Sequence, residues 1–370
     1  DITELFNNEW DDPRLAGHRE ALRGAAAALL PTLDAAVAHE RFFVPYRWDG
    51  RVLADDPDTA SGIIELPVAL MGVSRTLSVL NAMSKRAAAE AGDWDEVERR
   101  FKTGLALSER IGRQLLLIEV LVGASSEGVL LLEARKLLNE LDIPPLTAGA
   151  MLAALESRGD PFNNGERLVR GERIWSWVYT RSAFSKDGVV MLWNTDPFLS
   201  GPPGVLDRVM NIRAMALPTL GRIEPLWDEM EANALLAFNS EPYTPVDVDR
   251  WRLPIEMEDL VTLDAGSFRE VGTQLRRVRA EAAGLGVMLR LEIYHTEHGR
   301  WPAALTEAMT EGEATDPVSG RQFEYAVVDE PGRPYSLRFP RNAAYLLPIL
   351  EELPFDPHDL NAPRRTVPLM

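Results

Sequence analysis

The sequence predicts a mainly α-helical protein: irregular helical hairpins, then a long helix, then a small α+β module near the C-terminal end. Apolar residues recur at three- and four-residue spacings through residues 63–155 and again from Ser267 to Leu289, which is the periodicity of one helix face. Residues 322–328, QFEYAVV, instead alternate as a strand does, and YSLRF follows Pro331-Gly332 as the returning strand of a hairpin. The 46% apolar and 26% charged residues are typical of a globular chain and exclude wholesale disorder.

The 370 residues are too many for one small domain, and clusters of turn-forming residues divide them into five regions. We expect an N-terminal helical segment at 1–60, a helical-hairpin region at 61–158, a mixed, mainly helical region rich in tryptophan at 159–260, the long helix with the α+β module at 261–340, and an extended proline-rich tail at 341–370.

The first expected helix covers residues 18–43. Its apolar face is formed by residues at spacings of three and four: Leu22, Ala26, Leu29, Leu33 and Val37. Pro45 and the Asp49-Gly50 pair then break the helix with turn chemistry. No apolar run approaches the roughly 18 residues that cross a bilayer, so we expect no membrane span within the chain.

The hairpin region contains one motif with clear turn chemistry, the sequence GDWDEVERRFKTGLAL of residues 92–107. Gly92 suits the left-handed position that ends a helix, and Asp93 can accept the free backbone N–H groups of the next helix. An apolar stripe follows at helical spacing: Trp94, Val97, Phe101 and Leu105. The order Gly-Asp-aromatic, small residue, aromatic resembles the second half of a tetratricopeptide (TPR) repeat. Since no second copy recurs at a fixed period, we expect an irregular stack of TPR-like hairpins without a defined peptide groove.

Pro144-Pro145 separates two further expected helices, Ser126–Leu141 and Leu146–Ser157. Residues 159–260 then contain five tryptophans: Trp175, Trp177, Trp193, Trp227 and Trp251. Such residues could line a sugar-binding cleft or anchor helix packing, because the indole ring is large, apolar and carries one polar N–H. We favour packing and keep the cleft as the alternative.

The long helix shows an apolar seam from Phe268 to Leu289 and ends at Gly299, with Pro302 just beyond. Near its end, Glu292, His295 and His298 lie three residues apart and could face one metal ion. The spacing is not that of an HExxH zinc motif, so these residues are weak candidates and a structural role for both histidines is favoured. We expect no metal and no cofactor.

The segment after this helix resembles the C-terminal part of type II secretion pseudopilins. In that family a long helix ends in Tyr-x-x-x-x-Gly-x-aromatic-Pro, a short second helix follows, and Asp-Pro-x-x-Gly leads into a small antiparallel sheet. The resemblance implies this fold and an envelope location but no activity. Because the helix is internal, we do not expect the protein to be a pseudopilin itself. The matching residues are Tyr294, Gly299, Trp301, Pro302, Leu305, Asp316, Pro317, Gly320, Phe323, Tyr325, Tyr335 and Ser336.

The final segment has a proline every few residues, so it cannot form a long helix. It also carries apolar side chains that water would solvate poorly: Tyr345, Leu346, Leu350 and Phe355. We therefore expect the tail to be ordered against a protein surface, and we expect that surface to belong to a neighbouring subunit or a partner.

Charge and cysteine content exclude several classes of function. The formal net charge of -18 would repel nucleic-acid phosphates, so no nucleic-acid partner is expected. The absence of cysteine excludes disulfides, thiolate nucleophiles, cysteine-ligated zinc and iron–sulfur clusters. It is also common in exported bacterial proteins, so we expect export to the periplasm, envelope or cell surface. Since the chain begins at Asp1 rather than Met, we expect that a signal peptide or leader, or an unseen anchor, preceded it.

These observations favour a non-catalytic bacterial envelope or assembly protein that acts through protein–protein contacts or self-association. No nucleophile elbow, phosphate-binding glycine loop or dinucleotide fingerprint is recognisable, so no catalytic residue is assigned. The alternative is a glycan-acting hydrolase on a helical scaffold, with an acidic pair near Trp175, Trp177 or Trp193.

Overall fold

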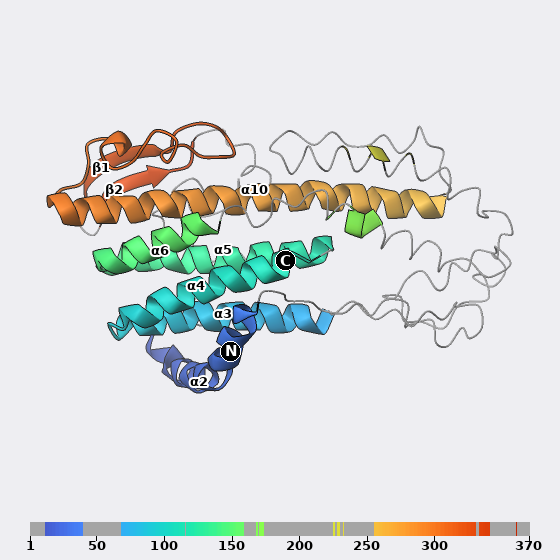
Figure 1. The fold of residues 1–370 in the computed structure, drawn as a ribbon, viewed down its shortest axis with the longest axis horizontal. Coiled ribbons are helices and arrows are strands. Elements are labelled where there is room, and N and C mark those ends of the chain that lie inside the picture. Colours follow the sequence, from blue (N-terminus) through green and yellow to red (C-terminus); the bar gives the residue numbers. More distant parts are fainter. Residues whose placement is uncertain are drawn as a thin grey trace, which may run out of the picture.

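The chain forms a layered bundle of helices with a small two-stranded sheet packed at one end (Figure 1). The computed structural model describes residues 12–39, 68–114, 116–158, 168, 170–173, 225, 228–229, 232, 255–330, 333–340 and 360. Its elements are η1 (Pro13–Leu15), α2 (Ala16–Ala38), α3 (Val68–Glu90), α4 (Trp94–Gly112), α5 (Leu117–Glu140), α6 (Pro145–Ser157), α10 (Ile255–His298), η7 (Leu305–Glu307), β1 (Glu324–Glu330) and β2 (Arg333–Arg338). The expected mainly helical architecture is confirmed for these residues.

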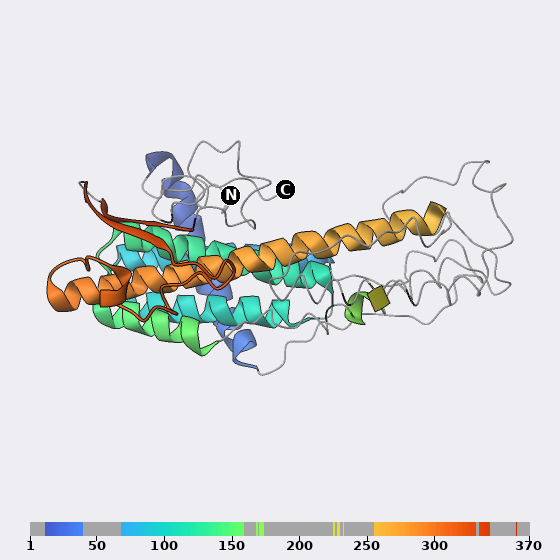
Figure 2. The ribbon, with the colours of Figure 1, turned by 90° about the horizontal axis from the view of Figure 1, so that it is seen from above.

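Helix α5 lies at the centre of the bundle and contacts α3, α4 and α10. Figure 1 shows α10 along one side of the molecule, α2 at the opposite edge, and α3, α4, α5 and α6 between them. Figure 2, seen from above, shows α10 extending well past the other described helices at its N-terminal end. Since α5 carries apolar side chains on all faces, a position inside the bundle is the one that buries them.

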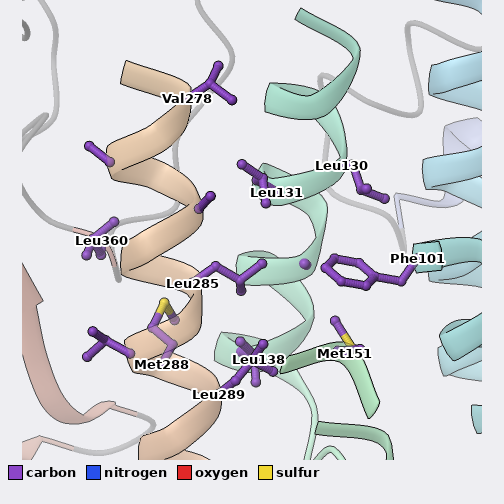
Figure 3. Close-up of a cluster of buried hydrophobic side chains, with 14 of the residues drawn as sticks. Phe101, Leu130, Leu131, Leu138, Met151, Val278, Leu285, Met288, Leu289 and Leu360 are labelled. Atoms are coloured by element: carbon purple, nitrogen blue, oxygen red, sulfur yellow. The ribbon is translucent and has the colours of Figure 1, made fainter. Parts of the chain in front are cut away.

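One continuous hydrophobic core joins the hairpin helices to α10 and the sheet. It includes Phe101 of α4, Leu131 of α5, Met151 of α6 and Leu285 of α10, all with 0% exposure (Figure 3). The regions 61–158 and 261–340, which the sequence separates by composition, therefore share their buried interior. The seam predicted on the long helix is buried from Val271 onward, and the side chain of Phe268 lies outside the described residues.

Two glycines allow α4 to approach its neighbours closely. A Cβ on Gly123 of α5 would lie 2.6 Å from the backbone N of Gly112, at the crossing of α5 and α4. A Cβ on Gly104 would lie 2.8 Å from Leu130 Cδ1, so α4 packs directly on α5 there. Backbone atoms at Gly112 cannot move aside as a flexible side chain can, so the α4–α5 spacing depends on glycine at position 123.

The C-terminal module begins where α10 ends at His298. Gly299 has φ +68, the left-handed conformation in which glycine carries no steric penalty, and its N–H donates to the His295 carbonyl oxygen at 2.8 Å. A second turn is built around Asp316, which is fully buried. Its carboxylate accepts hydrogen bonds from the N–H groups of Val318 and Ser319 at 3.1 and 3.2 Å. These positions match the predicted helix stop and turn.

Strands β1 and β2 pair antiparallel, with Tyr325 opposite Leu337 and Val327 opposite Tyr335. The predicted hairpin is thus present, with the first strand beginning two residues later than the alternation suggested. One face of the hairpin covers α10, because Tyr335 and Leu337 are buried in the shared core, whereas Glu324 and Ala326 on the other face are exposed.

Residue 360 of the tail docks on the same chain. Its N–H donates to the Leu337 carbonyl oxygen of β2 at 2.9 Å, and its side chain is 1% exposed. The Leu360 side chain lies beside α10 (Figure 3). Its methyl groups occupy the space above Gly284, where a Cβ would lie 2.9 Å from Leu360 Cδ1. We call this space the glycine notch. For Leu360 the docking surface is intramolecular; the rest of the predicted tail contact lies outside the described residues.

Candidate functional site

The candidate site lies where helix α2 packs across the hairpin of helices α3 and α4, and this hairpin forms the base of the site. Gly92 adopts φ +72 after α3, and the Asp93 side chain accepts a hydrogen bond from the Glu96 N–H at 3.1 Å, so both predicted turn roles are present. Phe101 of α4 is fully buried, and the ring of Trp94 is partly buried against the same core. The sequence motif therefore positions α4 relative to α3 by a tight turn and an apolar stripe.

Helix α2 lies across one face of this hairpin and contacts both α3 and α4. Its buried residues are leucines, which join α3 and α4 side chains in a second, smaller core. The α2 side of this core is Leu22, Leu30 and Leu33, preceded by Leu15 of η1; the other side is Val79, Leu80, Ala82, Met83, Leu107, Ile111 and Val129. Leu29, expected on the apolar face, is 45% exposed, because Leu30 occupies the buried position instead.

An ion network connects the C-terminal half of α2 to α4. The Asp34 carboxylate accepts hydrogen bonds from Arg99 Nη1 at 2.8 Å and Thr103 Oγ1 at 2.9 Å, and it also pairs with Arg100. The Arg100 side chain is fully buried, and Glu96 Oε1 lies 2.9 Å from its Nε. A buried guanidinium is stable only with such partners, so the Asp34 carboxylate stabilises the buried charge of Arg100.

A groove of about 360 Å³ opens beside α2, between α2 and the hairpin. Its volume is within the range of ligand sites. Five of its fourteen lining residues are alanines, and these short side chains leave the two surfaces incompletely packed. It is lined by Leu22, Arg23, Ala26, Ala27, Leu30, Pro31, Asp34, Ser84, Ala87, Ala88, Ala91, Asp93, Glu96 and Arg99.

Beneath this surface, Lys85 of α3 is buried in the bundle with 0% exposure. Its ammonium donates to the Leu130 carbonyl oxygen of α5 at 3.1 Å and lies 5.4 Å from the centre of the Phe101 ring. Burial lowers the pKa of Lys85 to about 7, although the negative charge of Glu133 acts in the opposite direction. This amine does not face the groove, so we assign it no chemical step.

The weak metal candidates on α10 point into separate contacts. The His295 ring stacks on Trp301 with centroids 4.2 Å apart, and the His298 ring stacks on Tyr294 at 4.0 Å. Burial, together with the nearby negative charge of Asp142, raises the pKa of Glu292 to about 7. Within residues 12–39, 68–158 and 255–340, as far as they are described, no group of three His, Asp or Glu side chains is placed to hold a metal ion.

The other motif residues of the C-terminal module fasten the end of α10 to the hairpin. The Tyr294 hydroxyl donates to Glu307 at 2.9 Å, and Arg300 pairs with the same carboxylate at 3.0 Å. The Tyr325 hydroxyl donates to the Pro302 carbonyl oxygen at 2.9 Å. These contacts hold the C-terminal module together, and none of these residues lines the groove beside α2. The turn that follows Asp316 contains Pro317 and Gly320, and Gly320 has φ +67.

The tryptophans proposed for a glycan cleft, Trp175, Trp177 and Trp193, lie outside the described residues, as does any acidic pair near them. Sequence reasoning missed Lys85 and the partnership of Asp34 with Arg100. One signal for the latter was available: Arg100 follows Val97 by three residues on the apolar stripe of α4, and a charge on a buried face requires a partner.

The helix formed by Pro13–Ala38 is, by length and composition, apolar enough to cross a membrane, with a mean hydropathy of 1.3 in its most apolar window. This observation is weak, because a signal sequence or the core helix of a soluble protein meets the same criterion. The sequence predicted a helix over residues 18–43 and no apolar run long enough to cross a bilayer, so this segment is more apolar than that prediction allowed.

Comparisons with known proteins add no relative: no family model matches the chain, and no curated protein or solved structure gives a significant match.

Proposed function

We propose that this protein is a non-catalytic scaffold or assembly factor of the bacterial envelope, and that it acts through protein–protein contacts on the face where α2 meets the α3–α4 hairpin. The observation that carries the proposal is the arrangement of Arg99, Arg100 and Thr103 around a carboxylate on another helix, beside an apolar surface that takes leucines. Binding of the apolar face of an amphipathic helix in a hydrophobic groove is a recurring mode of protein recognition.

The resemblances noted in the sequence fit this proposal. A TPR-like hairpin is supported by the Gly92 turn and the buried stripe of α4. A pseudopilin-like C-terminal module is supported by the stop at Gly299, the Asp316 turn and the antiparallel hairpin. The cysteine-free composition fits export, because a chain without thiols cannot form mispaired disulfides in an oxidising compartment.

Site-specific crosslinking in the native envelope tests the proposal. A photo-crosslinking residue at Ala91, which is exposed and lines the groove, should give a discrete adduct with another protein. The matched control is the same residue at Leu146 of α6, which is 89% exposed and not part of the groove. No adduct at Ala91, or the same adducts from both positions, would contradict the proposed contact surface.

A further inference from the structure

Helix α2 is attached to the bundle as a docked ligand is, through one face. Only 17% of its most apolar window is buried. Pro31 lies inside the helix, where it cannot donate to the Ala27 carbonyl oxygen and lowers the intrinsic stability of the helix. The groove next to Ala26 and Ala27 shows that the α2 contact leaves space unfilled. The resident helix therefore makes good contacts at its leucines and at Asp34, and poor ones between them.

The surface under α2 has the features of a receptor for a helix with a carboxylate. Arg99 and Thr103 both donate to Asp34, and the buried Arg100 pairs with it. Charge-assisted hydrogen bonds of this kind are the strong ones, and three donors converging on one carboxylate fix the register of the helix that supplies it. Asp34 follows Leu33 directly, so the carboxylate lies at the edge of the apolar stripe.

We propose that the α3–α4 face is a receptor for an amphipathic helix of a partner protein, in which an aspartate directly follows a leucine of the apolar stripe, and that α2 is the intramolecular occupant which this helix displaces. The inference rests on the proposed function and names the chemistry of its partner. The helix that displaces α2 has an ordinary helix former where α2 has Pro31 and a larger apolar residue where α2 has Ala26, because these changes remove the two defects of the resident helix.

Two other occupants fit the contacts less well. A membrane would take the leucines of α2 but would leave Asp34 without the three donors it has on α4. The α2 helix of a second copy carries the same proline and the same alanines, so it has no advantage over a resident helix that is already tethered to the receptor.

The test is a binding measurement on the full chain. A fluorescent peptide of residues 13–39 with Ala26→Leu and Pro31→Ala should bind, and the peptide without these two changes should bind roughly tenfold more weakly or worse. Adding Asp34→Asn to the improved peptide should weaken binding by roughly tenfold or more, as expected for lost charge-assisted hydrogen bonds. The matched control is Glu20→Gln in the same peptide. Glu20 pairs with Arg23 of its own helix at 2.8 Å, so this change should leave binding unaltered.

Hydrogen exchange on the wild-type chain locates the peptide without any variant of the protein. Saturating peptide should speed exchange of the α2 amides while α5 keeps its protection. Binding that ignores Asp34→Asn, or that leaves α2 exchange unchanged, overturns the inference. So does transfer of the peptide to phosphatidylcholine–phosphatidylglycerol vesicles with no binding to the protein, or a dimer that light scattering shows to dissociate on adding peptide. If the Ala91 crosslink forms but the peptide fails, the inference is wrong and the proposed function stands.

Discussion

Replacing Lys85 with methionine should stabilise the protein, because its contacts inside the bundle offset only part of the cost of burying the amine. Among the residues that the structure describes, its nitrogen contacts one acceptor, the Leu130 carbonyl oxygen, and the face of Phe101. Burial moves its pKa from 10.5 to about 7, and each pKa unit corresponds to about 1.4 kcal/mol, so the cost of the buried ammonium is on the order of 5 kcal/mol. Methionine has a similar length and flexibility, so the core can be filled again.

The lowered pKa of Lys85 also predicts how the free energy of unfolding changes with pH. Below pH 7 the amine is protonated in both the folded and the unfolded chain, so the full cost is present. Between pH 7 and 10.5 the unfolded chain binds a proton that the folded chain does not, so the free energy of unfolding of the wild type rises with pH across this window. The Lys85→Met variant lacks this rise. Its advantage should be on the order of 2–4 kcal/mol near neutral pH and should shrink as the pH increases.

Urea unfolding at about pH 6.5 and about pH 9, followed by circular dichroism, measures both effects. The control is Lys102→Met, since Lys102 is 52% exposed and pairs with Glu98 one turn away on α4. It should change the free energy of unfolding by about 0.5 kcal/mol or less and keep the wild-type pH slope. A Lys85→Met variant that is less stable than the wild type near neutral pH, or that keeps the wild-type slope, would refute the reasoning.

Three further substitutions have defined outcomes. Gly123→Ala places a Cβ against the backbone of Gly112 and should cost about 3 kcal/mol in thermal or urea unfolding, whereas Gly128→Ala on the same helix, with open space around it, should be neutral or stabilising by up to about 1 kcal/mol. Leu360→Ala empties the glycine notch and should cost about 2–3 kcal/mol by urea unfolding; no loss would mean that the tail contact is not held in solution. Asp316→Ala removes three hydrogen bonds from a fully buried turn and should both lower the melting temperature and speed proteolysis there; unchanged cleavage would count against the structural role of the carboxylate.

Local chemistry made parts of this fold predictable. A glycine in a left-handed conformation and an aspartate cap identify the turn before α4 at Gly92-Asp93, and the same logic identifies the end of α10 at Gly299. The first residues of the helices were harder to predict from the sequence. The helix expected from Ser126 begins at Leu117, because Glu119 bonds back to the Leu116 N–H without the usual polar cap residue to signal it.

The candidate site depended on tertiary structure that no local pattern contains. Asp34 and Arg100 are 66 residues apart, and only the placement of α2 across the hairpin brings them together. Likewise, the apolar periodicity of α3 marks a buried face but does not say that Lys85 lies under Phe101. A charged residue inside an apolar stripe indicates that some partner exists, and the fold decides which one it is.

The position of α5 between the hairpin helices and α10 has a consequence for synthesis of the chain. The apolar side of α5 that faces α10 includes Leu131 and Leu138 (Figure 3), and the helix that covers it there is made later in synthesis. About 100 residues separate the end of α6 from the start of α10, which a ribosome takes on the order of ten seconds to add. During that interval the nascent hairpins expose this apolar surface, so the emerging chain is a natural substrate for holdase chaperones. For the same reason, a product truncated after α6 should aggregate.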